Sequence, residues 1–259
     1  MRLLIIAPTN FQSYATAVLI KLLKDPDIEV VGVLVHAFNL ARLKNEFKRD
    51  GKRIFYKVLN KAILNEKKSM DYSFETPKRY LVQSGIKPNL KSLCDLHHIY
   101  HKKVSSFNSA NLIDDLTNLK IDIGAFCGGG LLRNRFLDSF SIGVLNCHMG
   151  FLPKYRGMDV VEWPFLENEN KQVGVTCHFM DKGIDTGDIL EIVRVDSAKF
   201  ENFIELREYL SGVMLKLIIK TISSIKKGSF KKQKQLQSDG KQYFVMHPTL
   251  KKITENKYK

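Results

Sequence analysis

The stretch RLLIIAPTNFQSYATAVLIKLLKDPDIEVVGVLV, residues 2–35, decides the fold class of this 259-residue chain. Its first apolar run ends at Pro8 and predicts a short strand that is buried on both faces. Turn and capping residues follow, and residues 14–24 place apolar side chains at helical spacing. Residues 28–35 read as a second buried strand. Strand, helix and strand at this spacing predict a parallel unit with a right-handed crossover.

The same alternation continues along the chain. Further strands are expected at 101–107, 121–127, 142–146, 172–181 and 188–196, and helices at 108–120, 159–170 and 200–226, with another helix in the segment 86–107. A basic amphipathic helix is expected within 40–68. The tail after residue 226 shows one short strand or hairpin, GKQYFVMHP at 240–248, and no helical stripe.

These elements predict an α/β protein. We expect a Rossmann-like fold with a mostly parallel central sheet, a mixed end, and a short C-terminal helix and hairpin extension. The main domain is expected at 1–196 and the basic extension at 197–259. In such sheets ligands bind outside the carboxyl ends of the strands, so functional residues are sought there.

The net charge of +14 is concentrated in two segments. Residues 41–69 hold ten basic and three acidic side chains, residues 226–259 hold ten and two, and the remainder is balanced. Such patches attract nucleic acid, anionic membranes or phosphorylated small molecules, and they also occur as solvated lysine-rich faces. We weigh the solvated face first, because neither segment interleaves aromatic residues as a base-stacking surface does.

The ends and the cysteines indicate a cytoplasmic protein. The opening apolar run is too short for a membrane span or a secretory signal, so we expect no membrane association. Four cysteines form no CxxC pair and fall mostly in apolar runs, which favours buried reduced thiols.

A polar cluster follows the strand at 142–146, within VLNCHMGFLPKYRG at 144–157. Side chains alternate along a strand, so Asn146 and His148 point to one side and Cys147 to the other. The amide donates hydrogen bonds and does not titrate near neutrality, whereas the imidazole moves a proton there. The pair suits a reaction that builds an oxyanion and shifts a proton.

A carboxylate to complete this pair lies in DKGIDTGDI, residues 181–189. Gly183 and Gly187 bracket Asp185 in a loop between two strands. A carboxylate beside His148 would orient the ring and raise its pKa. Taken alone, an Asn or a His at a strand end is more often a polar residue whose hydrogen bonds are made within the protein, and a DxG loop is more often a simple turn. Their joint occurrence favours a catalytic triad of Asn146, His148 and Asp185.

Both segments resemble the folate-dependent formyltransferase family. NCHMGFLPKYRG is similar to its signature loop, Asn-x-His-x-Ser-x-Leu-Pro-x-Tyr-Arg-Gly, and DKGIDTGDI is similar to its second loop. Asp185 follows Asn146 by 39 positions, close to the family interval. The resemblance is strong over 121–196 and weak over 1–196. It implies a formyltransferase fold and the transfer of a formyl group from 10-formyltetrahydrofolate to a primary amine, without a metal.

The resemblance also implies roles for individual residues. Asn146 would bind the formyl oxygen as it becomes an oxyanion, His148 would stabilise that charge and assist removal of the amine proton, and Asp185 would orient His148. Cofactor-binding residues carried over from the family are Gly129, Gly130, Leu131, Leu132, Met180, Asp181, Lys182, Gly183 and Ile184. The three glycines at 128–130 also fit a tight turn alone. Candidate substrate-binding residues are Asn10, Met149, Gly150, Tyr155 and Arg156.

The sequence departs from the family pattern in ways that bear on the acceptor. Gly150 stands where most relatives have Ser, and Met149 replaces a frequent Pro. Among the acceptors that the family uses, a nucleotide-linked amino sugar is our first expectation, because 197–259 leaves little room for the extra domain of the tRNA enzymes. Charged initiator tRNA is the alternative, since the basic segments would suit its backbone. Glycinamide ribonucleotide ranks last, because PTNFQS lacks a glycine-rich phosphate cradle.

Three further alternatives stay open at this point. A folate-hydrolysing deformylase would share the triad, and a noncatalytic binding module would show no turnover. Cys94, His97, His98 and His101 have the residue types and spacing of metal ligands, but no second ligand group follows, and we expect no metal. The apolar residues of 240–248 would suit a homodimer contact.

Overall fold

The computed structural model describes residues 1–37 and 74–258 and contains a seven-stranded central sheet with the order β3-β2-β1-β4-β5-β7-β8. The strands are β1 (Arg2–Ala7), β2 (Glu29–His36), β3 (Tyr100–Val104), β4 (Ile121–Phe126), β5 (Phe140–His148), β7 (Gly174–Phe179) and β8 (Ile189–Arg194). All neighbours from β3 to β5 run parallel, whereas β7 is antiparallel to β5 and β8 to β7. The expected parallel sheet with a mixed end is confirmed.

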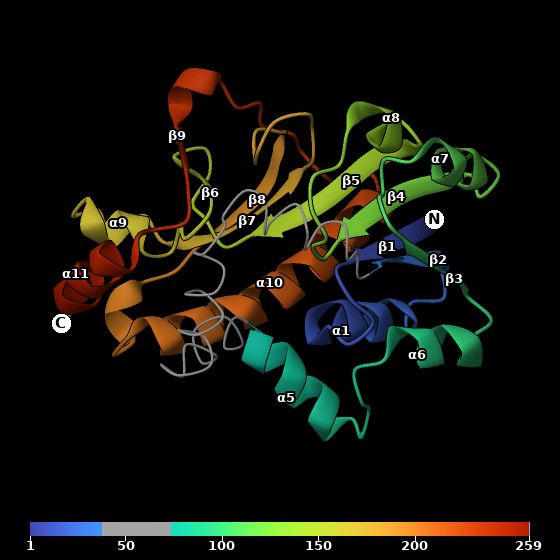
Figure 1. The fold of residues 1–259 in the computed structure, drawn as a ribbon, viewed down its shortest axis with the longest axis horizontal. Helices are drawn as coiled ribbons and strands as arrows, with labels where there is room; N and C mark the ends of the chain where they lie inside the picture. Colours follow the sequence, from blue (N-terminus) through green and yellow to red (C-terminus); the bar gives the residue numbers. More distant parts are fainter. Residues whose placement is uncertain (38–73, 259) are drawn as a thin grey trace, which may run out of the picture.

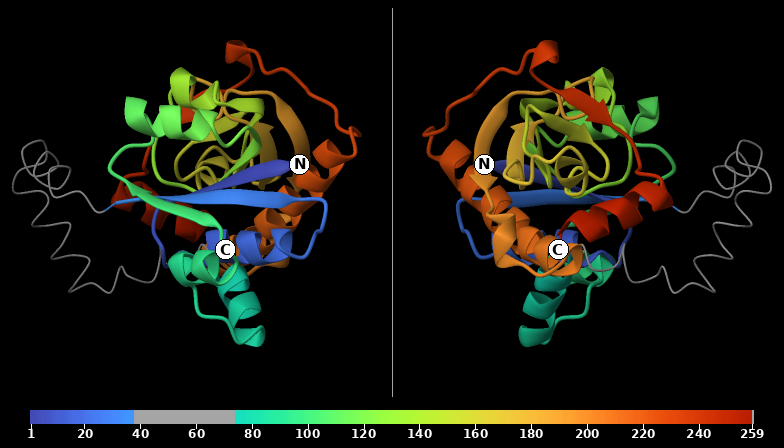
Figure 2. Two further views of the ribbon diagram at one scale, coloured as in Figure 1. Left: turned by 90° about the vertical axis from the view of Figure 1, so that its right-hand side faces the viewer. Right: turned by 90° about the vertical axis from the view of Figure 1, so that its left-hand side faces the viewer.

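Helices cover both faces of the sheet, as Figures 1 and 2 show. One face carries α1 (Ser13–Leu22), α5 (Glu75–Gln83), α6 (Leu90–Leu96) and the long α10 (Phe203–Lys226). The other carries α7 (Ala110–Thr117) and the single turn α8 (Asn134–Leu137). Strand β1 shows why two layers are needed, because its side chains alternate between two separate cores. Leu3 and Ile5 pack in one core and Leu4 and Ile6 in the other.

Helix α10 shares the larger core with α1 and the central strands. It begins cleanly because the side chain of Asn202 accepts hydrogen bonds from the backbone N–H groups of Ile204 and Glu205, both at 3.0 Å. Its buried residues include Leu206, Leu210 and Ile218. The apolar stripe seen in the sequence therefore places this helix against the sheet, where it supports β5 and β7 from below in the view of Figure 1.

A small second sheet connects the C-terminal segment to the loop after β5. Its strands β6 (Tyr155–Gly157) and β9 (Lys241–Tyr243) pair in parallel. Around it lie the 3-10 turn Gln237–Asp239, α9 (Trp163–Leu166) and α11 (Pro248–Tyr258), and another 3-10 turn at Ser197–Lys199 precedes α10. Segments 155–166 and 237–258 thus lie side by side at one end of the molecule (Figure 1).

The structure differs from the expected elements in three places, one shorter helix and two helices that were not expected. The helix expected at 159–170 shrinks to α9, because Asp159 takes a positive φ of 53°. Helix α11 exists although no stripe was seen, since Thr254 is the one residue in it that is classed as buried. Helix α5 was not expected either, and it buries only Pro77 and Leu81. Helices that contribute so few core contacts leave weak apolar periodicity.

The basic helix expected within 40–68 lies outside the described residues. Within 1–37 and 74–258, each helix is either too short or too polar to traverse a bilayer. All four cysteines are buried and free, as expected.

Candidate active site

Strand β5 presents Asn146 and His148 on the side of the sheet opposite to Cys147, as the alternation predicted. Cys147 is 3% exposed and packs in the larger core beside Cys177 of β7. Asn146 and His148 are partly buried and lie at the carboxyl end of β5. Their position is fixed on both sides, since β4 and β7 pair with this strand.

Asp185 lies against both residues, although 39 positions separate it from Asn146. Its carboxylate Oδ2 is 3.6 Å from His148 Nδ1, and its Oδ1 accepts from Asn146 Nδ2 at 3.4 Å. The side chains of His148 and Asp185 are 11% and 12% exposed. The structure therefore brings the three predicted catalytic residues together in one sheltered cluster that solvent reaches only in part.

A second histidine belongs to the cluster and was missed from the sequence. His178 of β7 pairs across the sheet with Asn146, and its Nε2 is 3.4 Å from Asp185 Oδ1 and 3.3 Å from Asn146 Nδ2. It is 1% exposed. The alternation of β7 placed it on the same face as Thr176, but only the register between β5 and β7 puts it opposite Asn146.

Asp185 is the hub of this network. Besides the two imidazoles and the amide, its Oδ2 accepts a hydrogen bond from the backbone N–H of Gly157 at 2.9 Å. Gly157 has φ +99°, and a Cβ there would lie 2.2 Å from the carbonyl oxygen of Tyr243. Only glycine allows β6 to approach β9 this closely while its N–H points at the carboxylate.

The electrostatics keep Asp185 ionised. Burial by itself raises the pKa of this carboxyl, but His148, His178 and the Gly157 N–H outweigh burial and lower the pKa below its ordinary value of 3.8. For His148 the balance is the reverse. Burial lowers the pKa of the imidazole below 6.5, and the attraction of Asp185 offsets that effect in part. At neutral pH the site therefore holds an anionic carboxylate beside a neutral imidazole that accepts a proton.

The side chain of His148 is held by the loop that follows it. Its Nε2 is 3.3 Å from the carbonyl oxygen of Tyr155. Gly150 lies so close that a Cβ would be 2.3 Å from His148 Nε2. The glycine in place of the family's usual serine thus leaves room for the imidazole in this position.

Two of the candidate substrate-binding residues are buried in the structure. Tyr155 is fully buried, stacks on Tyr243, and donates its hydroxyl toward Glu167 and Glu169 at 2.9 Å. Arg156 is 3% exposed, and its guanidinium donates to Gln235 and to the carbonyl oxygens of Leu236 and Gln237. Both side chains are engaged within the protein and hold the loop in place, and their contact with a substrate stays a prediction.

The other substrate candidates lie at different places. Asn10 follows β1, is 9% exposed, and its Oδ1 is 2.8 Å from His101 Nε2 on β3. Met149 is partly buried and packs against the larger core. Gly150 contacts His148 as described above. These residues surround the strand ends, and their contact with a substrate stays a prediction.

The predicted cofactor residues separate into two groups. Met180, Asp181 and Lys182 line a hollow of about 580 Å³, whose apolar wall includes Leu137 and Val144. Gly183 is exposed and Ile184 is 36% exposed on the same loop.

The glycine-rich loop does not line this hollow. It takes positive φ values of 127° at Gly129 and 110° at Gly130, Leu131 is 69% exposed, and Leu132 is buried in the smaller core. A tight turn accounts for this loop, and its contact with a cofactor stays a prediction.

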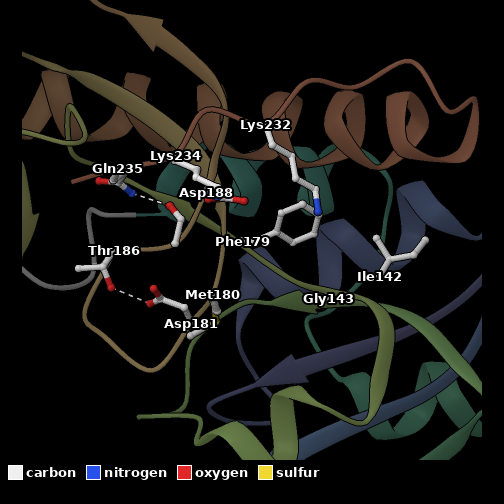
Figure 3. Close-up of a pocket in the computed structure, with 11 residues that line it drawn as sticks. Ile142, Gly143, Phe179, Met180, Asp181, Thr186, Asp188, Lys232, Lys234 and Gln235 are labelled. Atoms are coloured by element: carbon white, nitrogen blue, oxygen red, sulfur yellow. Dashed lines mark hydrogen bonds between the residues drawn. The ribbon is translucent and has the colours of Figure 1, made fainter. Parts of the chain in front are cut away.

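A second hollow of about 370 Å³ adjoins the first. Figure 3 shows it between the loop 180–188 and the segment 232–235, with Lys232 above the ring of Phe179 at 4.6 Å. Asp181 on its rim accepts a hydrogen bond from the Thr186 hydroxyl at 2.6 Å. Neither hollow is lined by Asn146, His148 or Asp185, so each lies beside this cluster rather than at it.

The cysteine and histidine cluster at 94–101 does not converge. Cys94 is fully buried in the core, His97 and His98 are exposed, and His101 is paired with Asn10. In the described part of the chain, no group of three or more potential metal-ligating side chains comes together.

The fold and the cluster define an α/β protein of the Rossmann-like class with an acid–base site at the end of a central strand. Residues 87–208 match the family model described as "Formyl transferase". This segment contains Asn146, His148, His178 and Asp185, so the part of the chain that carries the cluster is similar to that family.

The chain is also similar to curated proteins and solved structures that are named as formyltransferases. The methionyl-tRNA formyltransferase of Methylacidiphilum infernorum is 36% identical over 133 residues, which are 51% of this chain and 41% of that protein. The chain thus spans less than half of that relative. A sugar N-formyltransferase from a Shewanella species superposes with a TM-score of 0.59 at 14% identity, covering 100% of this chain and 87% of that one.

A further solved structure shows the same fold. The N-formyltransferase of Helicobacter canadensis, in complex with folinic acid and dTDP-3-aminofucose, superposes with a TM-score of 0.52 at 18% identity. The superposition covers 94% of this chain and 70% of the Helicobacter canadensis chain. At these identities both solved structures confirm the expected fold.

Proposed function

We propose that this chain transfers the formyl group of 10-formyltetrahydrofolate to the primary amine of a nucleotide-linked amino sugar. The observation that carries the proposal is the contact of Asp185 with both His148 and Asn146 across two elements. A buried carboxylate that supports an imidazole and an amide suits an acyl transfer to an amine, which needs a proton acceptor and a donor to the developing oxyanion.

Each residue has a distinct task in this proposal. The nitrogen of Asn146 carries two hydrogens and lies 3.4 Å from Asp185 Oδ1 and 3.3 Å from His178 Nε2. It gives up one of these long contacts and donates to the formyl oxygen as negative charge develops there. His148 is neutral at pH 7 and accepts the proton that the amine must lose once its nitrogen bonds the formyl carbon. The bond from that carbon to the folate nitrogen breaks, and the same proton is available to the departing nitrogen. Asp185 holds the imidazolium during this exchange.

In this proposal the folate binds in the larger hollow. The volume of that hollow, about 580 Å³, lies within the range for small-molecule sites, and its lining combines apolar residues such as Val144 and Leu137 with the polar Asp181. A flat heterocycle with several nitrogen donors suits such a lining. The hollow lies beside Met180, on the loop that also carries Asp185, so a ligand there would be near the cluster.

The extent of the structural similarity supports an amino sugar as the acceptor. The solved Shewanella and Helicobacter canadensis enzymes, which their descriptions link to sugars or an aminofucose nucleotide, align with 100% and 94% of this chain. The curated tRNA relative aligns with 51%. A charged initiator tRNA is the second candidate, favoured by that relative and by the excess of basic residues.

The test is the release of tetrahydrofolate from 10-formyltetrahydrofolate with nucleotide-linked amino sugars, with charged initiator tRNA and without an acceptor. We expect turnover with an amino sugar and a loss of roughly 100-fold or more in His148→Ala. His97→Ala, which alters an exposed histidine outside the cluster, should keep wild-type rates.

The other outcomes decide between the alternatives. Turnover with tRNA alone, falling steeply with salt, would replace the sugar by the tRNA. Release of formate without any acceptor would indicate a hydrolase. Folate binding without turnover would contradict the enzymatic proposal.

A further inference from the structure

Gln235 in the C-terminal segment joins the two loops of the catalytic cluster. Its amide nitrogen donates to the carbonyl oxygens of Asp185 at 3.1 Å and Gly187 at 2.6 Å. Its amide oxygen accepts from Arg156 Nε at 3.3 Å. We propose that Gln235 is a positioning residue that fixes the backbone of Asp185 and thereby the place of its carboxylate, an inference that rests on the proposed formyl transfer for its catalytic meaning.

Asp185 needs such support because its backbone is strained. It has φ +54°, in the left-handed region that costs a non-glycine residue energy unless its surroundings hold it there. The loop around it connects β7 to β8, and Gln235 binds the carbonyl groups on either side of Thr186. These two bonds restrain the backbone of the turn, whereas the Gly157 N–H holds the carboxylate itself.

The amide of Gln235 has one orientation that satisfies every partner. Two carbonyl oxygens lie at its nitrogen and a guanidinium N–H lies at its oxygen, so turning the amide over would break all three contacts. Figure 3 shows Gln235 beside the loop 180–188 with its bond to Gly187 dashed.

Arg156 fastens the segment that carries Gln235. Its guanidinium also donates to the carbonyl oxygens of Leu236 at 2.8 Å and Gln237 at 3.4 Å. Because Arg156 is adjacent to Gly157 in sequence, it connects the loop after β5 to the C-terminal segment, and Gln235 connects that segment to Asp185. A part of the chain beyond the first 196 residues thus contributes directly to the geometry of the cluster.

Gln235→Ala and Gln235→Glu test this role, with Gln233→Ala as the matched control. Glutamate keeps the volume and the acceptor for Arg156 but removes the amide hydrogens that bind the two carbonyl groups. Gln233 lies two residues away, its side chain is exposed, and it makes no side-chain hydrogen bond to the described residues, while its backbone pairs with Ile189 in all variants.

Two measurements are made on each full-length variant. The first is kcat and KM for tetrahydrofolate release with the acceptor that the wild type uses. The second is the NMR titration of His148, whose charged form is attracted by Asp185 and repelled by His178. The thermal midpoint is recorded alongside, so that loss of folding is separated from loss of positioning.

We expect both Gln235 variants to lose about 10- to 100-fold in kcat with a KM within about twofold, as misplacement of a catalytic group does. The titration midpoint of His148 should fall, because a displaced carboxylate supports the imidazolium less. Gln233→Ala should match the wild type in both.

Three results would overturn the proposal. An unchanged His148 titration and kcat in Gln235→Glu would show that the carboxylate does not depend on these bonds. A rise in KM alone would make Gln235 a ligand contact instead. Rates that fall only in parallel with the thermal midpoint would show a general structural role. If the wild type shows no turnover with any acceptor, the formyl-transfer proposal fails, and the His148 titration still tests Gln235.

Discussion

At the scale of single residues, Asp185 has the most contacts in the cluster and supplies its negative charge. It contacts two histidines, one amide and one backbone N–H, and each of these stabilises its ionised form. Its preference for the ionised state holds a negative charge beside His148 at neutral pH. These neighbours, and not the DxG motif alone, keep Asp185 ionised, because a DxG loop without them is an ordinary turn.

Gly150 should be intolerant of any side chain. An added Cβ in Gly150→Ala would lie 2.3 Å from His148 Nε2 and 2.8 Å from the Tyr155 carbonyl oxygen, so the imidazole must move. We expect a fall of about 100-fold in kcat for tetrahydrofolate release, with a small change in thermal midpoint.

The control for this change is Gly228→Ala. Gly228 has φ +67° and no described residue within 4 Å of an added Cβ, so it reports backbone strain alone and should leave kcat unchanged. Wild-type activity in Gly150→Ala would mean that the position of His148 is less exacting than the structure indicates.

At the scale of elements, the loop after β5 is held from α10 as well as from the C-terminal segment. Arg207 of α10 forms a bidentate pair with Glu162, at 2.7 Å and 2.6 Å, just before α9. Glu162 is 7% exposed, and this carboxylate raises the pKa of Arg207 against the effect of burial. The pair ties the region after the signature loop to the helix that supports the sheet.

Glu162→Ala should destabilise the protein strongly, because it leaves the buried Arg207 with Asp159 at 3.9 Å as its remaining carboxylate among the described residues. We expect a loss of about 3 kcal/mol in the free energy of unfolding, measured by urea denaturation. Glu208→Ala removes the partner of Arg79, whose side chain is 66% exposed, and should cost less than about 1 kcal/mol. Equal losses in the two variants would contradict a special role for the buried pair.

At the scale of the whole molecule, the cluster also contributes to stability against acid. The pKa of Asp185 is lowered in the folded state, so near pH 4 the folded protein binds fewer protons there than the unfolded chain does. Its contribution to the free energy of unfolding is therefore fully present above about pH 4 and is lost as the pH falls below that value.

Urea unfolding of wild type and Asp185→Asn at pH 6 and pH 3 measures this contribution. The wild type should lose more stability between the two values than the variant does, because asparagine cannot be protonated in this range. Equal losses of stability in the wild type and in Asp185→Asn would show that folding does not lower the pKa of Asp185.

The order of elements along most of the chain could be predicted from local pattern. The strands at 2–8, 28–35 and 121–127 and the helix at 200–226 appear close to where their apolar periodicity placed them. Helices α5 and α11 could not be predicted, since they bury too little surface to leave a pattern. The domain boundary at 196 and the individual site residues stay predictions.

By itself, the sequence determined the sheet and the candidate catalytic residues, because strand alternation and the two loop motifs are local properties of the chain. Only the tertiary structure decided that His178 faces Asn146, that Tyr155 and Arg156 are buried supports, and that Gln235 holds Asp185. Each of these depends on strand register or on a contact between distant segments. Neither register nor long-range contact leaves a periodic trace in one sequence, since both are fixed by packing once the whole chain has folded.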